Sequence, residues 1–358
     1  MEVKKALIVT DGFLRSLPGG PVEKVINSLD EVGITYAFYD EVEPNPKDTN
    51  VRDGLKVFQD ENCDLIVTVG GGSAHDCGKG IGIAATHEGD LYENYAGIET
   101  LTNPLPPIVC VNTTAGTGSE VTRHCVITNT EKKIKFVIVS WRNTPLVSIN
   151  DPELMVGKPA GLTAATGMDA LTHAIESYVS LGANPVTDSM AIQAIKLIST
   201  NLRQAVAYGQ NIEARENMAH ASLLAGMAFN NAGLGYVHAM AHQLGGLYDI
   251  PHGVANAVLL PHVEEFNIIS NPKKFADIAE FMGENIEGLS VREAADKAIA
   301  AIRKLSEDVN IPSNMRALGV KEEDFEKMAK LALEDGNAVS NPIQGKEQDI
   351  IDIFKAAY

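Results

Sequence analysis

The spacing of the hydrophobic residues changes once along this chain of 358 residues. In the first part, apolar residues form short uninterrupted runs, which are typical of strands buried on both faces of a parallel sheet. These runs predict strands at ALIVT (6–10), TYAFYD (35–40), DLIVTV (64–69) and PPIVCVN (106–112), and strand-like segments at FVIVS (136–140) and LVSIN (146–150).

Helical patterns alternate with these runs. VEKVINSLDEVG (22–33) and VRDGLKVFQDENC (51–63) each place apolar residues at helical spacing between two predicted strands. Such alternation indicates a parallel sheet with helices on both faces. From Lys158 onward, long alanine-rich helical patterns take over and strand signals disappear. We therefore predict a Rossmann-like α/β domain over residues 1–155 and an all-α domain over residues 156–358.

The composition excludes several classes of protein. The apolar fraction is 45% and the charged fraction 21%, both near the norm for globular proteins, so a disordered chain is not expected. The net charge of −18 argues against binding to nucleic acids and to anionic membrane surfaces. We expect a soluble protein whose partners are small molecules.

The cysteines and the amino terminus indicate the compartment. The four cysteines form no CxxC pair and lie in or beside apolar segments, so we expect buried free thiols. The first apolar run is too short for a signal peptide, and no apolar stretch reaches transmembrane length. These features predict a protein of the reducing cytoplasm.

Candidate metal ligands gather between residues 226 and 262, a stretch that holds four of the nine histidines among small and apolar residues. His238 and His242 are four positions apart, so on a helix they share one face. His252 directly follows Pro251, at the predicted start of the next helix.

A second helical pair lies upstream, where GMDALTHAIESY places Asp169 and His173 four positions apart. One carboxylate and several imidazoles on helical faces are typical ligands of a divalent transition metal. The alternative is that these are hydrogen-bonded core histidines whose spacing arises by chance. Two pairs together with His252, among apolar neighbours that offer little polar compensation, favour the metal.

The predicted α/β domain carries a glycine turn suited to a phosphate. In LIVTVGGGSAHDCGKG, a buried strand ends at the turn and a helix follows it. Glycine lets the backbone approach an anion, and the N–H groups and dipole of the helix favour a pyrophosphate there. Ser73 and Asp76 also fit a helix cap with its capping-box partner. Lys79 either balances charge or is solvated.

Asp11 and the later segment TTAGTGSE add candidates for dinucleotide binding. A standard fingerprint has its glycines after the first strand and an acidic residue about twenty positions later, and this chain departs from that order. Asp11, at the end of the first strand, suits either a ribose contact that favours NAD over NADP or a simple turn. The hydroxyls and amides of TTAGTGSE suit phosphate or nicotinamide. Lys135 either points toward the cofactor or protects an edge strand.

Five stretches resemble, in this order, the iron-dependent (group III) alcohol dehydrogenases. They are GGGSAHDCGKGIG, TTAGTGSEVT, DPELM, ATGMDALTHAIESY and GYVHAMAHQLGGLYDIPHGVANAVLLPHV. The resemblance covers essentially the whole chain. It implies a dinucleotide domain of the dehydroquinate-synthase-like type, a helical metal domain, and an NAD(H)- and Fe(II)-dependent interconversion of a small aldehyde and a primary alcohol.

The resemblance also implies roles for individual residues. The implied metal ligands are Asp169, His173, His238 and His252, and His242 matches a histidine beside the substrate that acts in catalysis. Phe229 and His124 match positions near the nicotinamide and substrate. The implied cofactor-binding residues are Asp11, Asn45, Gly71, Gly72, Ser73, Asp76, Thr113, Thr114, Thr117, Thr122 and Lys135.

Within the family, EPNPKDTNVRDGL, NTTAGTGSEVTRHCVITNTE and KFVIVSWRN look closest to members that act on a short diol, which implies reduction of a 3-hydroxyaldehyde. A homo-oligomer, a dimer or larger, is also expected. Zn, Mn, Ni and Co suit the same ligands as Fe(II). Other readings are another short-chain alcohol dehydrogenase, a zinc-dependent glycerol dehydrogenase, a lyase resembling dehydroquinate synthase, and a non-enzymatic nucleotide sensor or metal store.

Overall fold

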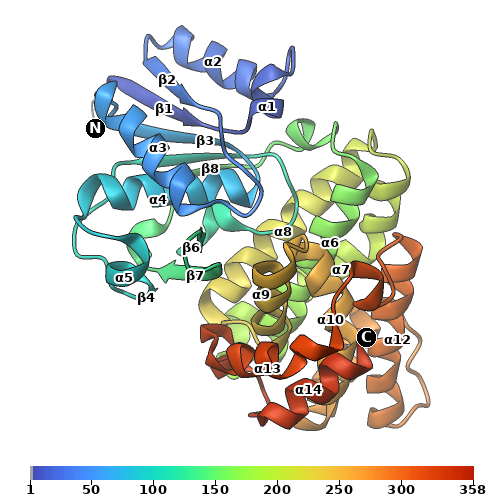
Figure 1. Ribbon diagram of the computed structural model, residues 1–358. Helices are drawn as coiled ribbons and strands as arrows, with labels where there is room; N and C mark the ends of the chain where they lie inside the picture. Colours follow the sequence, from blue (N-terminus) through green and yellow to red (C-terminus); the bar gives the residue numbers. More distant parts are fainter. Residues whose placement is uncertain (1–2) are drawn as a thin grey trace. The chain divides into compact units, whose positions relative to one another are not determined.

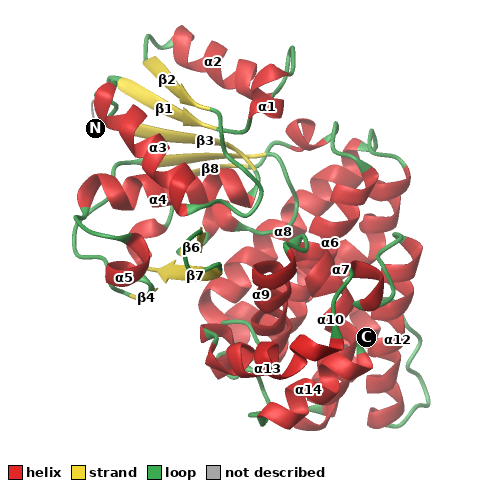
Figure 2. Cartoon of the chain, viewed as in Figure 1, coloured by secondary structure: helices red, strands yellow, loops and turns green. Residues whose placement is uncertain are grey.

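Strands and helices separate along the chain as the hydrophobic pattern predicts (Figure 2). The structure is a computed structural model that describes residues 3–358. It divides into two units. The first comprises residues up to Thr114 and the segment Gly118–Met155, and the second comprises Ala115–Thr117 and Val156–Tyr358.

A five-stranded parallel sheet organises the first unit, in the order β2-β1-β3-β5-β8 (Figure 1). The strands are β1 (Lys5–Val9), β2 (Thr35–Tyr39), β3 (Leu65–Gly70), β5 (Ile108–Asn112) and β8 (Val147–Ile149). The helices of this unit are α1 (Gly12–Ser16), α2 (Pro21–Glu31), α3 (Asp48–Asp60), α4 (Gly72–Thr86) and α5 (Leu91–Tyr95).

Both faces of the sheet are buried, which explains the uninterrupted apolar runs. Leu7 and Val9 of β1 pack on one face with Ile81 of α4, whereas Ala6 and Ile8 pack on the other with apolar residues of α1 and α2. The parallel α/β fold predicted from the sequence is therefore confirmed.

A small second sheet was not foreseen. It has the order β4-β7-β6, with strands β4 (Gly97–Ile98), β7 (Ile134–Val139) and β6 (His124–Asn129). The strand-like FVIVS segment belongs to β7, which pairs antiparallel with β6 and lies outside the main sheet. Lys135 pairs with Thr128 of β6 and lies outside the two residues of β7 that pair with β4, Ile138 and Val139, so the edge-strand role considered for it stays a prediction.

The second unit is helical, as predicted. Its helices are α6 (Ala160–Val179), α7 (Pro185–Ala207), α8 (Ile212–Ala232), α9 (Tyr236–Tyr248), α10 (His252–Asn267), α11 (Pro272–Phe281), α12 (Val291–Asp308), α13 (Phe325–Glu334) and α14 (Glu347–Ala356). Helix α6 is central, because α7, α8 and α10 all pack on it. All four cysteines of the chain are buried and free, as expected.

Glycines set how closely the helices of the second unit approach α6. A Cβ on Gly253, in the first turn of α10, would lie 2.2 Å from the carbonyl oxygen of Ala165. A Cβ on Gly167 would lie 2.3 Å from the Leu202 side chain of α7. The backbone contact at Gly253 therefore admits only glycine at this spacing, whereas a larger residue at Gly167 would require the Leu202 side chain to move. Across residues 3–358, no helix combines the length and the apolar character needed to cross a bilayer.

Helix α4 packs equally closely on the sheet, and this contact is testable. A Cβ on Gly78 would lie 2.2 Å from Cγ2 of Thr68 on β3, whereas a Cβ on Gly82 would make ordinary contacts at 3.5 Å. We expect Gly78→Ala to lower the free energy of unfolding by about 1–3 kcal/mol through overpacking. Gly82→Ala, on the same helix, should be neutral or stabilising by up to about 1 kcal/mol. Equal effects of the two substitutions in chemical denaturation would contradict this packing.

Candidate metal and cofactor sites

Three of the four expected metal ligands converge. Oδ1 of Asp169 on α6 lies 3.9 Å from Nε2 of His238 on α9 and 3.7 Å from Nε2 of His252 on α10. All three atoms lie within 4.8 Å of one another. Bonds of 2.0–2.2 Å to a tetrahedral metal would separate ligand atoms by about 3.4 Å, so the observed spacing needs only a small adjustment.

Asn256 marks the point on which these atoms converge. It lies one helical turn after His252, and its amide nitrogen is 2.7 Å from Oδ1 of Asp169, 3.1 Å from Nε2 of His238 and 3.2 Å from Nε2 of His252. A side-chain amide has two N–H protons, too few for three acceptors. Three lone pairs directed at one point, two from the buried Asp169 and His238 and one from the half-buried His252, fit a divalent cation better.

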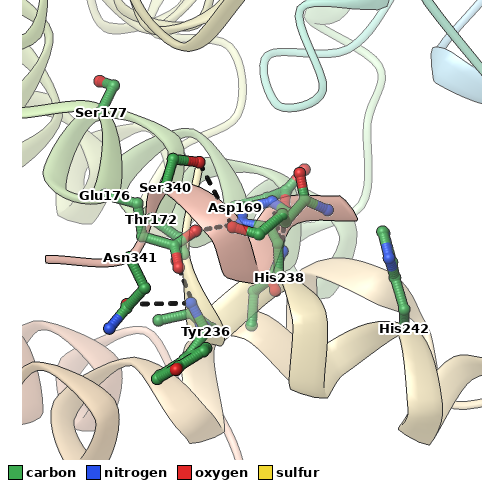
Figure 3. Close-up of polar contacts among 12 residues, drawn as sticks. Asp169, Thr172, Glu176, Ser177, Tyr236, His238, His242, Ser340 and Asn341 are labelled. Atoms are coloured by element: carbon green, nitrogen blue, oxygen red, sulfur yellow. Dashed lines mark hydrogen bonds and ion pairs between the residues drawn. The ribbon is translucent and has the colours of Figure 1, made fainter. Parts of the chain in front are cut away.

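Glu176 fixes the orientation of His238 (Figure 3). In its ionised form, Glu176 accepts a hydrogen bond from Nδ1–H of His238 at one oxygen, and the other oxygen accepts from the N–H of Val237 at 2.7 Å. The proton on Nδ1 leaves Nε2 as the metal-binding atom. A Cβ on Gly235 would lie 3.0 Å from Glu176, so the glycine that precedes α9 permits this contact.

The protonation states of His238 and Glu176 favour the binding of a cation. Burial lowers the pKa of His238 to about 4, so its imidazole is neutral at pH 7, the form that binds metals. Burial also raises the pKa of Glu176 to about 8. A divalent cation beside His238 would stabilise the charged carboxylate and offset the cost of its burial.

His173 lies beside this group without joining it. Its ring stacks on His238 with 4.5 Å between centroids, and on Phe229 with 4.4 Å. Its nitrogens are not among the atoms that lie within 4.8 Å of one another. Burial lowers the pKa of His173 to about 4, so it is a neutral imidazole at neutral pH. Its role as a fourth ligand stays a prediction.

His242 shares the helix of His238 and stacks on His252 with 5.5 Å between ring centroids. Its Nδ1–H donates to Oδ2 of Asp335 at 2.7 Å. Burial alone would raise the pKa of Asp335, but the charge of His242 and its hydrogen bond hold that pKa below its usual value. Asp335 therefore acts as an acceptor that orients the ring of His242 and leaves its Nε2 free of this contact.

In the first unit, the loops that follow β1, β3 and β5 begin at the same edge of the sheet, because these strands are parallel. The Thr10 hydroxyl donates to the carbonyl of Val69 at 2.8 Å, and the N–H of Thr113 donates to the carbonyl of Gly70 at 2.8 Å. A Cβ on Gly71 would lie 2.7 Å from Oγ1 of Thr114, so the two loops predicted to bind the cofactor touch there.

The proposed cap at Ser73 is wrong. Helix α4 begins at Gly72 with Gly71 as its N-cap, and no side chain caps it. Ser73 lies inside the first turn, and Asp76 instead accepts from the Ser119 hydroxyl at 2.7 Å. The first N–H groups of α4 are therefore not used by a side-chain cap and suit an anion.

Other candidates for cofactor binding are placed as follows. Oδ1 of Asp11 caps α1 by accepting from the N–H of Leu14 at 2.8 Å, the turn role considered as an alternative. Asn45 and Lys135 meet, because Oδ1 of Asn45 accepts from Nζ of Lys135 at 2.7 Å. Thr117 belongs to the segment that clusters with the helical unit.

Lys79 is fully buried, so the solvated role considered for it is wrong. Its Nζ donates to the backbone carbonyls of Thr122 and His124, two residues expected near the cofactor and substrate, at 3.0 Å and 2.7 Å.

Four contributors were missed by the sequence analysis: Glu176, Asn256, Asp335 and the buried role of Lys79. Glu176 is seven positions after Asp169, and Asn256 is four after His252, so helical spacing places each on the face of a predicted ligand and was an available signal. Asp335 lies far along the chain from His242, and no local pattern connects the two.

The two halves of the chain each match a known family. Residues 1–152 match the family described as iron-containing alcohol dehydrogenase, and residues 163–358 match the carboxy-terminal part of the Fe-containing alcohol dehydrogenase family. The chain belongs to the iron-containing alcohol dehydrogenases. Membership implies iron and NAD(H), the expected cofactors, and it supports an oxidoreductase over the lyase and the non-enzymatic alternatives.

Relatives of this dehydrogenase include several alcohol and aldehyde enzymes. It is 74% identical to 1,3-propanediol dehydrogenase of Klebsiella pneumoniae, over 99% of this chain and 92% of the relative. It is 51% identical to NAD-dependent methanol dehydrogenase of Bacillus methanolicus, over the same shares. A crystal structure of 1,3-propanediol oxidoreductase matches with a TM-score of 0.97 at 73% identity, covering 99% of this chain and 92% of that one.

The contact between Glu176 and His238 yields a test. In Glu176→Gln, the amide oxygen can still accept from Val237, which turns the NH₂ group toward His238. Nδ1 must then accept, and the proton moves to Nε2, the metal-binding atom. We expect the affinity for Fe(II) or Co(II), measured by competition with a chelator, to fall about 10-fold to 100-fold.

The matched control is Glu264→Gln, which also replaces a buried carboxyl but one that hydrogen-bonds Asn267. This variant should bind metal with nearly the affinity of the unaltered dehydrogenase. Undiminished binding in Glu176→Gln, or an equal loss in the control, would show that Glu176 does not set the tautomer of His238.

Proposed function

We propose that this dehydrogenase interconverts 3-hydroxypropionaldehyde and 1,3-propanediol, with NAD(H) as redox partner and Fe(II) as the metal. The observation that carries the proposal is the convergence of Asp169, His238 and His252 on one point in a chain 74% identical to a 1,3-propanediol dehydrogenase. The other relatives, which include a methanol dehydrogenase and a lactaldehyde reductase of Escherichia coli, support small aldehydes and alcohols as the substrate class.

The metal would be held by Asp169, His238 and His252, and His173 is proposed as the fourth ligand. When bound, iron supplies a Lewis acid for the substrate oxygen, and NADH supplies the hydride. The protein prepares this site in advance. Glu176 sets the tautomer of His238, and burial keeps the imidazoles of His238 and His173 neutral and ready to bind.

His242 is proposed as the residue that handles the proton. Its Nδ1–H is engaged by Asp335, so Nε2 is the atom that can hold or release a proton. Asp335 is itself fixed, because its other oxygen accepts from the N–H of Asn337 at 2.9 Å. Phe229, stacked on His173, contributes an apolar ring beside the proposed ligands and is proposed, with His124, to contact substrate and nicotinamide.

The cofactor would bind at the carboxyl ends of β1, β3 and β5. The uncapped first turn of α4, with Gly71, Gly72 and Ser73, is proposed to take the pyrophosphate. We propose that the remaining predicted residues complete the site, with Asp76 acting indirectly through Ser119. They are Asp11, Asn45, Thr113, Thr114, Thr117, Thr122 and Lys135.

A homo-oligomer in the cytoplasm, expected from the sequence, also stays a proposal. The edge strand β8 supports self-association, because Val147 and Ile149 are 44% and 43% exposed at a side of the sheet where no strand among residues 3–358 pairs. Light scattering of the purified enzyme would give its oligomeric state.

The division of roles between two histidines is the test of this function. His252→Ala should lose bound iron and turnover of 3-hydroxypropionaldehyde while NADH binding, followed by fluorescence, persists. His242→Ala should keep its iron, measured by plasma emission spectrometry, and lose about 10²-fold to 10⁴-fold in turnover rate, because it removes a group that transfers a proton.

His220→Ala, on the exposed surface of α8, is the control for loss of an imidazole and should behave like the parent enzyme. Loss of iron in His242→Ala would identify His242 as a ligand. A panel of propanal, 3-hydroxypropionaldehyde and glyceraldehyde then tests the substrate, since the proposal requires the 3-hydroxyaldehyde to have the highest kcat/KM.

A further inference from the structure

Lys79 is a fully buried lysine, and the dehydrogenase mechanism does not use it. Lysine is rarely buried unless its ammonium group is fully paired. Here Nζ donates to three backbone carbonyls: Ser119 at 2.7 Å, Thr122 at 3.0 Å and His124 at 2.7 Å. It also lies 2.9 Å from the Ser119 hydroxyl and 3.8 Å from Oδ1 of Asp76.

The carbonyls of Ser119 and Thr122 belong to the segment that joins β5 to β6, and His124 is the first residue of β6. Apart from the short 3-10 turn η1 (Ser119–Val121), this segment has no regular structure, and Gly118 before the turn has a positive φ of 61°. Its backbone oxygens therefore need partners from outside. Lys79 supplies them from the middle of α4, a helix that is itself fixed against the sheet by Gly78.

Asp76 belongs to the same arrangement. Its Oδ1 accepts from the Ser119 hydroxyl at 2.7 Å, one turn before Lys79 on α4. A carboxylate near a proposed phosphate site would repel the phosphate if its charge were uncompensated. The neighbouring ammonium group offsets that charge, so Asp76 serves as a second tether of Ser119.

The tethered segment carries much of the proposed cofactor site. Thr113, Thr114 and Thr122 lie on it, and Thr114 touches Gly71 at the start of α4. We propose that Lys79 is a positioning residue for dinucleotide binding, which ties the β5–β6 segment to α4 and so holds both phosphate-side loops in one arrangement. This inference rests on the proposed function, because it presumes that the dinucleotide binds at these loops.

The test compares three substitutions in the full-length, iron-loaded enzyme. Lys79→Met keeps the length of the side chain and removes every donor. Lys79→Gln keeps a neutral NH₂ donor on a shorter chain. Lys56→Met, at an exposed position of α3, is the control. NADH binding is measured by fluorescence titration, together with the KM for NADH, kcat, the KM for aldehyde and the iron content.

A positioning role predicts a specific pattern. In Lys79→Met, the dissociation constant and KM for NADH should rise about 10-fold to 100-fold, since a displacement of about 1 Å can cost that much. The kcat at saturating NADH, the KM for aldehyde and the iron content should stay within about threefold of the parent, because the substitution leaves the reacting groups in position. Lys79→Gln should be intermediate, and Lys56→Met unchanged.

If Lys79→Met does not fold, Ser119→Ala decides the question, because it removes only the hydroxyl shared by Lys79 and Asp76. Weaker NADH binding with unchanged iron would then support the proposal. A folded variant with normal NADH affinity, or one that loses iron and aldehyde affinity in parallel with NADH, would overturn it. Failure of the parent enzyme to bind NADH would instead contradict the proposed function.

Discussion

A carboxylate and two imidazoles that converge on one point constrain the helical unit more than any other feature. Asp169, His238 and His252 come from three different helices, and Asp169 and His238 are buried whereas His252 is half-buried. Lone pairs buried together are costly unless a positive group satisfies them. The amide of Asn256 provides part of that compensation, and a divalent cation would provide it fully.

The packing around this point explains sequence features with no chemistry of their own. Gly253 lets the first turn of α10 lie directly on α6, which brings His252 to Asp169. Gly235 leaves room for Glu176 at the start of α9, where the carboxylate accepts from a backbone N–H and from His238. The glycines therefore matter for the ligands, because the close spacing of the helix backbones determines where the ligand side chains lie.

The same principle operates in the α/β unit. Gly78 brings α4 onto β3, and Gly71 brings the start of α4 onto Thr114. Lys79 then extends from α4 to fix a segment that lacks regular structure. Close backbone contacts fix how the helix packs on the sheet. A few buried polar side chains then hold the connecting loops in position.

The architecture could be predicted from the sequence because the patterns that indicate each strand and helix lie within short segments of the chain. The doubly buried strands, the helical spacing of Asp169 with His173 and of His238 with His242, and the start of α10 at His252 could all be derived from short windows.

Contacts that depend on distant segments could not be derived in this way. Asp335 contacts His242 from 93 positions further along the chain, and β6 is defined by its pairing with β7. The N-cap of α4 is Gly71, not Ser73. Local propensity carries no information about such partners.

Diffraction at the iron absorption edge, from crystals grown with Fe(II) under anaerobic conditions, tests the shared metal point most directly. The account predicts one anomalous peak about 2.0–2.2 Å from the carboxylate of Asp169 and from Nε2 of His238 and His252, the distances usual for oxygen and nitrogen ligands of a divalent metal. A peak bound by other residues, or a fully active enzyme whose crystals show no peak at this point, would contradict it.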